Sequence, residues 1–307
     1  WDFCVRVDRS KLNKRTLEAL IKAGAFDSIE RNRAALQASM EDAFEYANAQ
    51  LANANQGGLF DMMGDDAQGA STQEPPLAQV LPWGVREQLM HEKTAVGFYL
   101  SGHLFDEVQE EVRRFIRTPL DELKDSREPQ LMAGIVSELR VINSQRGGKL
   151  CLFKLDDKSA VLEASVDEAT YNAAKNLLKD DEFVILQGRV QHDHFSGGLR
   201  IKATQVWSLA DARCRFARYL LIEAGDKRPR IERLLQAYPA RQQVGDDGLP
   251  VSLGVRLRVL LHCHADDASA SVELELGPEH QCYPSDAALA DWRAEVGSDA
   301  CRLVWRS

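Results

Sequence analysis

Apolar residues recur at helical spacing through the first part of the chain. They predict a helix over residues 10–23, with Ser10 as its N-cap and Gly24 as the glycine that ends it. The same spacing predicts further helices over residues 31–52, 83–100 and 106–117. We therefore expect this part of the chain to be helical.

The pattern changes to that of strands beyond residue 130. Five strands separated by turn residues are predicted, over residues 131–143, 150–155, 161–166, 183–191 and 199–207. A helix over residues 167–178 lies between the third strand and the fourth. Five strands with one helix in that position are typical of an OB-fold, a small and partly open barrel.

The last segment, residues 211–307, mixes both patterns. Strands are predicted over residues 214–223, 251–262 and 272–276, and helices over residues 229–237 and 285–296. At 307 residues the chain has room for two or three domains. We therefore expect a multidomain α+β protein with a helical N-terminal part, a five-stranded OB-fold barrel over residues 126–210 and a compact C-terminal α+β domain.

A polar linker interrupts the helical part. Residues 53–82, rich in Asn, Gln, Gly, Asp and Pro, separate residues 1–52 from a second helical segment, residues 83–125. The linker contains one apolar island, in which Leu59 and Phe60 are suited to enter pockets of a partner protein. The alternative is that these two side chains attach the linker to the core of the chain itself.

Charge is distributed unevenly along the chain. The formal net charge of −9 by itself argues against a nucleic-acid binder, because such proteins usually have a basic surplus. Residues 40–128, however, hold 17 acidic residues against 7 basic ones. Residues 1–39 hold 8 basic residues against 5 acidic ones, and residues 129–210 hold 10 of each. The total charge therefore does not exclude nucleic-acid binding by the N-terminal helices or by the barrel.

The predicted barrel has side chains suited to single-stranded nucleic acid. OB-folds bind such strands with the face of strands 2 and 3 and with the loops that join strands 1–2 and 4–5. Cations in these places can neutralise phosphates, and aromatic rings can stack on bases. The candidates are Arg146, Lys149, Phe153, His194, Phe195, Arg200 and Lys202. The alternative is that both phenylalanines are packed inside the fold and that the charges are ordinary solvated ones.

A basic cluster lies at the start of the first predicted helix. It comprises Arg6, Arg9, Lys11, Lys14 and Arg15. Cations at a helix N-terminus oppose the helix dipole, so an external anion such as a phosphate backbone would explain them. A solvated helix face is the alternative.

Other chemistry is not visible in the sequence. The six cysteines form no C-x-x-C pair, so free thiols in a reducing cytoplasm are expected. The run His262–His264 is interpreted as the end of a strand rather than as a metal site, and the pair Asp156-Asp157 as turn residues. No nucleophilic catalytic arrangement and no membrane span is predicted. The start at Trp1 suggests a piece of a longer protein.

Five stretches of the sequence indicate a resemblance to a known family. They are Leu12–Asp27, Gln56–Phe60, Glu92–His103, Leu155–Ser159 and Phe195–Leu199. The first resembles the end of the helix-hairpin-helix region of the bacterial replicative C-family polymerase, the DNA polymerase III alpha subunit. The second resembles that family's internal sliding-clamp-binding motif, the third the segment after it, and the last two its OB domain.

The resemblance implies a role for each part of the chain. Gln56, Leu59 and Phe60 would dock in the sliding clamp (beta). The helix-hairpin-helix remnant, with Lys11, Lys14 and Arg15, would lie near primer–template duplex, and the barrel would contact single-stranded template DNA. Residues 211–307 would bind the clamp-loader tau subunit.

The resemblance also implies what this chain does not do. The family's palm domain adds deoxynucleotides with aspartates and Mg²⁺, and no part of it is recognised here. We therefore expect no catalytic residue, no bound metal and no cofactor in this chain, which would be a non-catalytic part of a cytoplasmic DNA-directed DNA polymerase. Two alternatives are the error-prone paralogue of the same polymerase and a stand-alone single-strand-binding OB protein.

Overall fold

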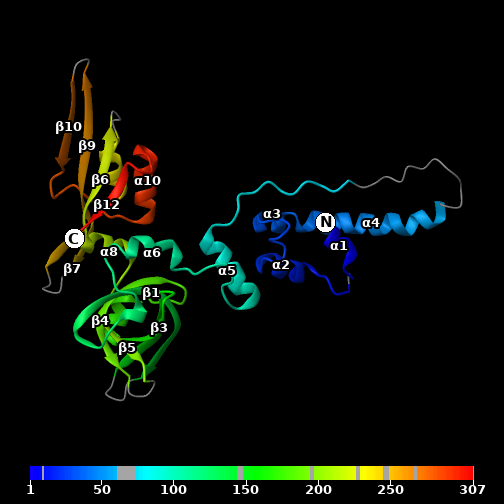
Figure 1. The fold of residues 1–307 in the computed structure, drawn as a ribbon, viewed down its shortest axis with the longest axis horizontal. Coiled ribbons are helices and arrows are strands. Elements are labelled where there is room, and N and C mark those ends of the chain that lie inside the picture. The colour runs from blue at the N-terminus through cyan, green and yellow to red at the C-terminus, as the bar shows by residue number, and fades with distance from the viewer. Residues whose placement is uncertain are drawn as a thin grey trace. The chain divides into compact units, whose positions relative to one another are not determined.

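The computed structural model describes residues 1–8, 10–60, 73–143, 148–193, 197–225, 229–244, 249–265 and 268–306; the side chains of residues 54–60, 244, 263–265 and 268 are outside that description. The chain divides into two compact units, Trp1–Leu104 and Phe105–Ser307 (Figure 1). Each unit has its own buried core.

The first unit is helical, as predicted. Its helices are α1 (Asp2–Arg6), α2 (Lys14–Lys22), α3 (Arg33–Ala38), α4 (Met40–Phe60) and α5 (Val85–Val96). The inward side of α2, with Leu17 and Ile21, belongs to the same buried cluster as Ala47 of α4. Phe3 and Phe26 add an edge-to-face contact with 5.0 Å between ring centroids.

Helix α2 begins later than predicted. Its N-cap is Asn13, whose side chain accepts a hydrogen bond of 2.9 Å from the backbone N–H of Thr16. Ser10 does not cap the helix, because it lies three residues before the actual N-cap; its backbone N–H donates to the side chain of Asp8. The predicted end is confirmed, since Gly24 adopts the left-handed conformation with φ of 79°.

The helix predicted over residues 31–52 is two helices. Buried Ser39 separates α3 from α4, and its hydroxyl oxygen accepts a hydrogen bond of 2.8 Å from the backbone N–H of Ala78. Helix α4 then continues to Phe60, so the first residues assigned to the linker, 53–60, fall within its bounds. Helix α5 ends before the predicted residue 100, because Gly97 adopts the left-handed conformation.

The second unit contains the predicted barrel. Its strands are β1 (Ser126–Asn143), β2 (Lys149–Asp156), β3 (Val161–Asp167), β4 (Phe183–His192) and β5 (Leu199–Trp207). They close in the order β1-β2-β3-β5-β4, with β3 and β5 parallel and the other neighbours antiparallel. Helix α7 (Glu168–Ala174) follows β3 and is capped by Asp167. This is the predicted OB-fold.

Close approach of backbones shapes one side of the barrel. A Cβ atom on Gly188 would lie 2.4 Å from the carbonyl oxygen of Lys202 on the neighbouring strand. The register between β4 and β5 shifts at the same place, between Gln187 and Gly188. Glycine therefore lets β4 and β5 pair closely where the ladder is irregular.

A C-terminal α+β domain completes the second unit. Helices α6 (Asp106–Val112) and η1 (Leu120–Glu122) precede the barrel, and the elements that follow it are α8 (Leu209–Phe216), β6 (Ala217–Gly225), α9 (Ile231–Ala237), β7 (Arg241–Val244), β8 (Pro250–Leu253), β9 (Val255–Ala265), β10 (Ala268–Glu275), β11 (Gln281–Cys282), α10 (Asp286–Val296) and β12 (Cys301–Trp305). The main sheet has the order β10-β9-β6-β12, and β7 pairs with β8. Trp292 of α10 is fully buried in the core of this domain.

The C-terminal domain departs from the prediction in several elements. Cys214 lies in α8 and not in a strand, because Ser208 and Asp211 form a capping box that starts a helix there. The long strand predicted over residues 251–262 is interrupted at Gly254 between β8 and β9. Strands β7 and β12 were not predicted.

Buried Arg213 of α8 links α6, which precedes the barrel, to the C-terminal domain. Its guanidinium donates to both carboxylate oxygens of Glu111 on α6, at 2.6 and 2.8 Å. It also donates to the carbonyl oxygen of Pro284 at 2.9 Å and to Asp286 of α10 at 2.7 Å. These contacts hold α6, α8 and α10 together within the second unit.

Candidate nucleic-acid interface

The side chains on the outer face of strand β2 are not those that were predicted. Side chains alternate along the strand, so that Cys151, Phe153 and Leu155 are buried in the barrel core. Phe153 is only 1% exposed and cannot stack on a base, which corrects its assignment as a contact residue. The outward positions include Leu152 and Lys154 instead. Lys154 indicated this orientation in the sequence, because a charged residue marks the solvent face of a strand.

Two cations lie side by side on the outside of the neighbouring strands. Lys202 of β5 is exposed, as predicted, and pairs in register with exposed Arg189 of β4. On its other side Lys202 pairs with Ser165 of β3. Neither cation forms a salt bridge with any residue that the structure describes, so both charges are available to an anion. Sequence analysis missed Arg189, although the alternation of Gln187 and Arg189 with buried residues marked the outward face of β4.

Arg200 has a different environment from Lys202. Its guanidinium forms a salt bridge of 2.8 Å with Glu163 on β3, and Asp193 lies 3.6 Å away. The side chain is half-buried, and its charge is balanced within the barrel. Arg200 therefore ties β5 to β3, which makes it a weaker candidate for phosphate binding than Lys202.

The loop between β1 and β2 is described only at its edge. Lys149 is exposed at the start of β2, where its backbone N–H donates to the Glu168 carboxylate at 3.0 Å. Arg146 lies outside the described residues. The same holds for His194 and Phe195, in the loop between β4 and β5.

The basic cluster at the N-terminus is partly neutralised. Lys14 forms an exposed salt bridge of 2.7 Å with Glu41, and Arg6 pairs with Asp2. Lys11 and Arg15 are exposed and form no ion pair with a described residue. They remain the candidates for contact with a phosphate backbone in the first unit, and Arg9 is outside the description.

The predicted clamp motif falls at the end of α4. Gln56, Leu59 and Phe60 lie within the bounds of this helix, but their side chains are outside the described part of the chain. The structure therefore leaves their predicted contacts untested.

The pair Asp156-Asp157 lies at the turn between β2 and β3, as predicted. Asp156 accepts a hydrogen bond from the backbone N–H of Lys158. Buried Asp157 accepts from the Arg113 guanidinium at 2.8 Å and from the backbone N–H of Leu120 at 3.0 Å. Burial alone would raise the pKa of Asp157, but its hydrogen bonds hold that pKa below the usual value. The pair is structural.

The described part of the chain shows neither a metal site nor a membrane span. No three His, Cys, Asp or Glu side chains there gather in a way that could hold a metal ion. Among the same residues, no helix has both the length and the apolar character that a membrane span needs. Among the cysteines whose side chains are described, free thiols are found at Cys4, Cys151, Cys214, Cys282 and Cys301.

Two family models match parts of the chain. A helix-hairpin-helix motif model matches residues 1–36, which hold α1, α2 and the start of α3. An OB-fold nucleic acid binding domain model matches residues 131–209, which hold most of the barrel. Both matches agree with the observed elements.

A solved structure of a single domain is also similar. The second OB-fold domain of replication protein A from Methanococcus maripaludis covers 30% of this chain and 93% of its own length, at 17% sequence identity and a TM-score of 0.24. At that TM-score the likeness adds no weight to the assignment.

Curated relatives match along the whole chain. DNA polymerase III subunit alpha of Neisseria meningitidis serogroup B is 38% identical over 99% of this chain and 25% of its own length. The Pseudomonas aeruginosa subunit is 40% identical over 100% of this chain and 26% of its own length. The Escherichia coli K12 subunit is 32% identical over 99% of this chain and 25% of its own length. The chain therefore corresponds to the C-terminal portion of bacterial DNA polymerase III alpha subunits, and it spans about a quarter of the length of the relatives that it matches.

Proposed function

We propose that this chain is the non-catalytic C-terminal part of a replicative DNA polymerase, which holds single-stranded template DNA and connects the polymerase to its partner proteins. The match to DNA polymerase III alpha subunits over 99% of the chain supports the polymerase role. Nucleotide addition, with its Mg²⁺, would belong to the part of the relatives that this chain does not match. The setting would be the bacterial cytoplasm.

The DNA-binding role rests on one observation. A closed OB barrel displays Lys202 and Arg189 next to one another on its outer face, and neither forms a salt bridge with a described residue, although the charge of Lys202 acts on the nearby carboxylate of Asp167. Unpaired cations on such a surface attract the phosphates of a single strand. Exposed Lys149, on β2, adds a third charge to the same barrel.

Reversing both charges is expected to weaken binding of single-stranded DNA. We expect the Arg189→Glu/Lys202→Glu variant to bind a fluorescent oligothymidylate at least tenfold more weakly than the unmodified chain in low salt. Loss of two phosphate contacts should also reduce the slope of log K against log salt by about 1.4, since each contact to a single strand contributes about 0.7. Fluorescence anisotropy titrations at several salt concentrations measure both quantities.

The matched control reverses two exposed lysines of the same barrel, Lys175 and Lys179, which follow α7. This variant has the same net charge as the test variant. If both variants lose affinity equally, the effect is one of net charge, and the proposed contact at Arg189 and Lys202 is wrong.

The proposed partners are the sliding clamp, primer–template duplex and the clamp-loader tau subunit. Clamp binding is proposed for Gln56, Leu59 and Phe60 on their resemblance to the family's internal clamp motif. Lys11 and Arg15 are proposed to contact duplex backbone, because they are exposed and lack a described partner. The C-terminal domain, residues 211–307, is proposed to bind tau.

Removing the two apolar side chains of the motif tests the clamp proposal. The Leu59→Ala/Phe60→Ala variant is expected to lose measurable binding to the sliding clamp, because adjacent apolar anchors supply most of the affinity of a short motif. Isothermal titration calorimetry with the purified clamp measures this. The Met62→Ala/Met63→Ala variant, two residues further along the chain, is the control and should bind normally. Undiminished binding by the first variant contradicts the proposal.

A further inference from the structure

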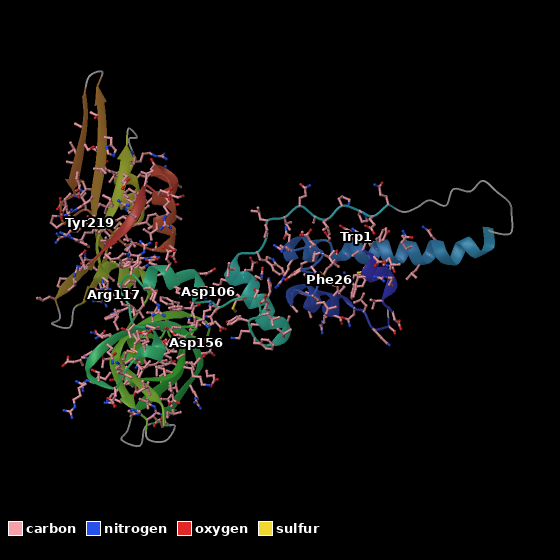
Figure 2. The ribbon with its side chains drawn as sticks, viewed as in Figure 1. Trp1, Phe26, Asp106, Arg117, Asp156 and Tyr219 are labelled. Atoms are coloured by element: carbon pink, nitrogen blue, oxygen red, sulfur yellow. The ribbon has the colours of Figure 1, made fainter. Side chains whose placement is uncertain are left out.

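Two adjoining hollows lie where the barrel meets the C-terminal domain, inside the second unit. One has a volume of about 580 Å³ and the other about 640 Å³. Both are lined by Leu131 of β1, by Arg215 and Phe216 at the end of α8 and by Arg306 after β12. We call the combined hollow the arginine groove. Arg117 lines its first part and lies between the barrel and the C-terminal sheet (Figure 2).

The walls of the groove have fixed positions. Phe115 stacks between Trp305 and Phe216, with centroid distances of 4.7 and 5.4 Å. The backbone N–H of Arg306 donates to the carbonyl oxygen of Phe216 at 3.2 Å. The guanidinium of Arg215 lies over the ring of Trp207, 4.9 Å from its centroid. These contacts fix the guanidinium of Arg215 and the backbone of Arg306.

The charge of the groove is one-sided. Four arginines line it, and none of its described lining residues is acidic. Arg114 has a partner in Glu110, at 2.9 Å. Arg117, Arg215 and Arg306 form no ion pair with a described residue, and the buried Nε of Arg215 has no hydrogen-bond acceptor. Like charges gathered without counter-charges repel each other, so the groove favours an external anion.

The other lining residues suit nucleobases. The half-buried rings of Phe216 and Trp207 offer apolar surface for stacking. The amides of Gln187, Gln205 and Gln243 line the second hollow and can donate to or accept from base edges. A duplex keeps the faces of its bases stacked inside, so only a single strand can offer base faces to these rings together with phosphates to the arginines.

The groove is continuous with the outer face proposed to bind DNA. Gln187 and Gln205 are paired in register on β4 and β5, and Arg189 and Lys202 form an outward pair further along the same two strands. On its other side Gln187 pairs with Leu131, which lines the groove. A strand lying across Lys202 and Arg189 would thus reach the groove over the two glutamines.

We infer that the arginine groove is a second binding site for single-stranded DNA, in which Arg117, Arg215 and Arg306 hold phosphates while bases pack on Phe216 and Trp207. The site extends the path of the strand from the barrel onto the C-terminal domain. The inference relies on the proposed function only for the identity of the ligand.

The test removes two exposed charges of the groove without touching its buried parts. The Arg117→Gln/Arg306→Gln variant of the full chain is compared with Arg218→Gln/Arg233→Gln, which removes two exposed arginines on β6 and α9 that do not line the groove. Fluorescence anisotropy is measured with oligothymidylates of about 8 and about 20 nucleotides, because one OB-fold covers roughly 4–16 nucleotides. A duplex of the longer length is the third probe.

We expect the groove variant to bind the longer oligonucleotide about tenfold more weakly than the control variant, with a salt slope lower by about 1.4. The shorter oligonucleotide, which the barrel face alone can hold, should be much less affected. Equal affinity of the groove and control variants for the longer strand overturns the inference. So does a loss confined to the duplex, which would assign the arginines to double-stranded DNA.

The two proposals fail separately in this design. If Arg189→Glu/Lys202→Glu abolishes binding while the groove variant binds normally, the barrel face stands and the groove is wrong. If only the groove variant loses affinity, the groove stands and the barrel face is wrong. Absence of any binding by the unmodified chain overturns both.

Discussion

Replacing Arg213 with methionine is expected to lower the free energy of unfolding of the second unit by about 3 kcal/mol, the lower end of the cost of breaking a buried ion pair. Arg213 is 4% exposed and joins Glu111 of α6 to the start of α10. Methionine replaces the unbranched apolar stem of arginine but has no donor, so Glu111 and the Pro284 carbonyl oxygen both lose their hydrogen bonds to this side chain. We expect the lower end of that range of costs because Glu111 and Asp286 keep some contact with water.

The control is Arg302→Met, which breaks an exposed salt bridge of 2.9 Å with Glu223. Its cost should stay below about 1 kcal/mol, as for exposed pairs in general. Hydrogen exchange of peptides from α10 and β6 at increasing urea concentration reports on the second unit alone. Equal losses of protection in the two variants would show that the buried network adds nothing beyond an ordinary surface pair.

The barrel was predicted well because its strands repeat a simple pattern. Apolar residues alternate with polar ones, turn residues separate the strands, and Asp167 marks the start of α7. The orientation of β2 was harder, since Leu150, Leu152 and Phe153 are apolar on both faces of the strand. Only Lys154 distinguishes the two faces.

The buried arginines were not predicted, for a physical reason. Charged residues are usually exposed, and nothing near Arg33 or Arg213 in the sequence shows that it is enclosed. Arg33 has one partner nearby in the sequence, Asp27, but its buried partner Glu92 lies far along the chain, as do Glu111 and Asp286, the partners of Arg213. Such pairs become visible only when the fold brings distant segments together.

In the candidate interface, too, some features follow from local sequence patterns and others depend on the fold. The exposure of Lys202 agrees with local alternation along β5, in which Ile201 and Ala203 on either side of it are buried, whereas its predicted contact with DNA stays a prediction. The arginine groove was not predicted. Along the sequence, Arg117 precedes the barrel and Arg306 follows the last strand of the C-terminal sheet, so the two residues are far apart in the chain. Local patterns predict single strands and their exposed faces, whereas a site made by two domains depends on how those domains pack.

The second large effect is expected in the first unit, at Glu92. Its carboxylate is fully buried and accepts hydrogen bonds from the Arg33 guanidinium at 2.8 Å and from the backbone N–H groups of Leu100 and Ser101 at 2.6 and 2.9 Å. Replacing Glu92 with glutamine keeps the size but removes the charge opposite buried Arg33. Breaking such a pair costs about 3–5 kcal/mol, and we expect the lower end because Arg33 keeps two hydrogen bonds to Asp27.

The pH dependence distinguishes this charge effect from a loss of packing. Burial raises the pKa of Glu92, but the hydrogen bonds from Ser101, Leu100 and Arg33 outweigh it and hold the pKa below the ordinary value of 4.5. A carboxyl whose pKa is lowered by folding stabilises the fold above its unfolded-state pKa, and this contribution disappears as the pH falls through the folded-state pKa. The difference in unfolding free energy between the unmodified chain and Glu92→Gln should therefore be large at pH 7. It should shrink as the pH falls below 4.5 and through the folded-state pKa of Glu92.

Hydrogen exchange of α3 and α5 peptides, at pH 7 and at an acidic pH below 4.5, measures this difference. The control is Glu41→Gln, which breaks only the exposed pair with Lys14. A deficit of the same size at both pH values would show that shape, and not the charge of Glu92, stabilises this unit.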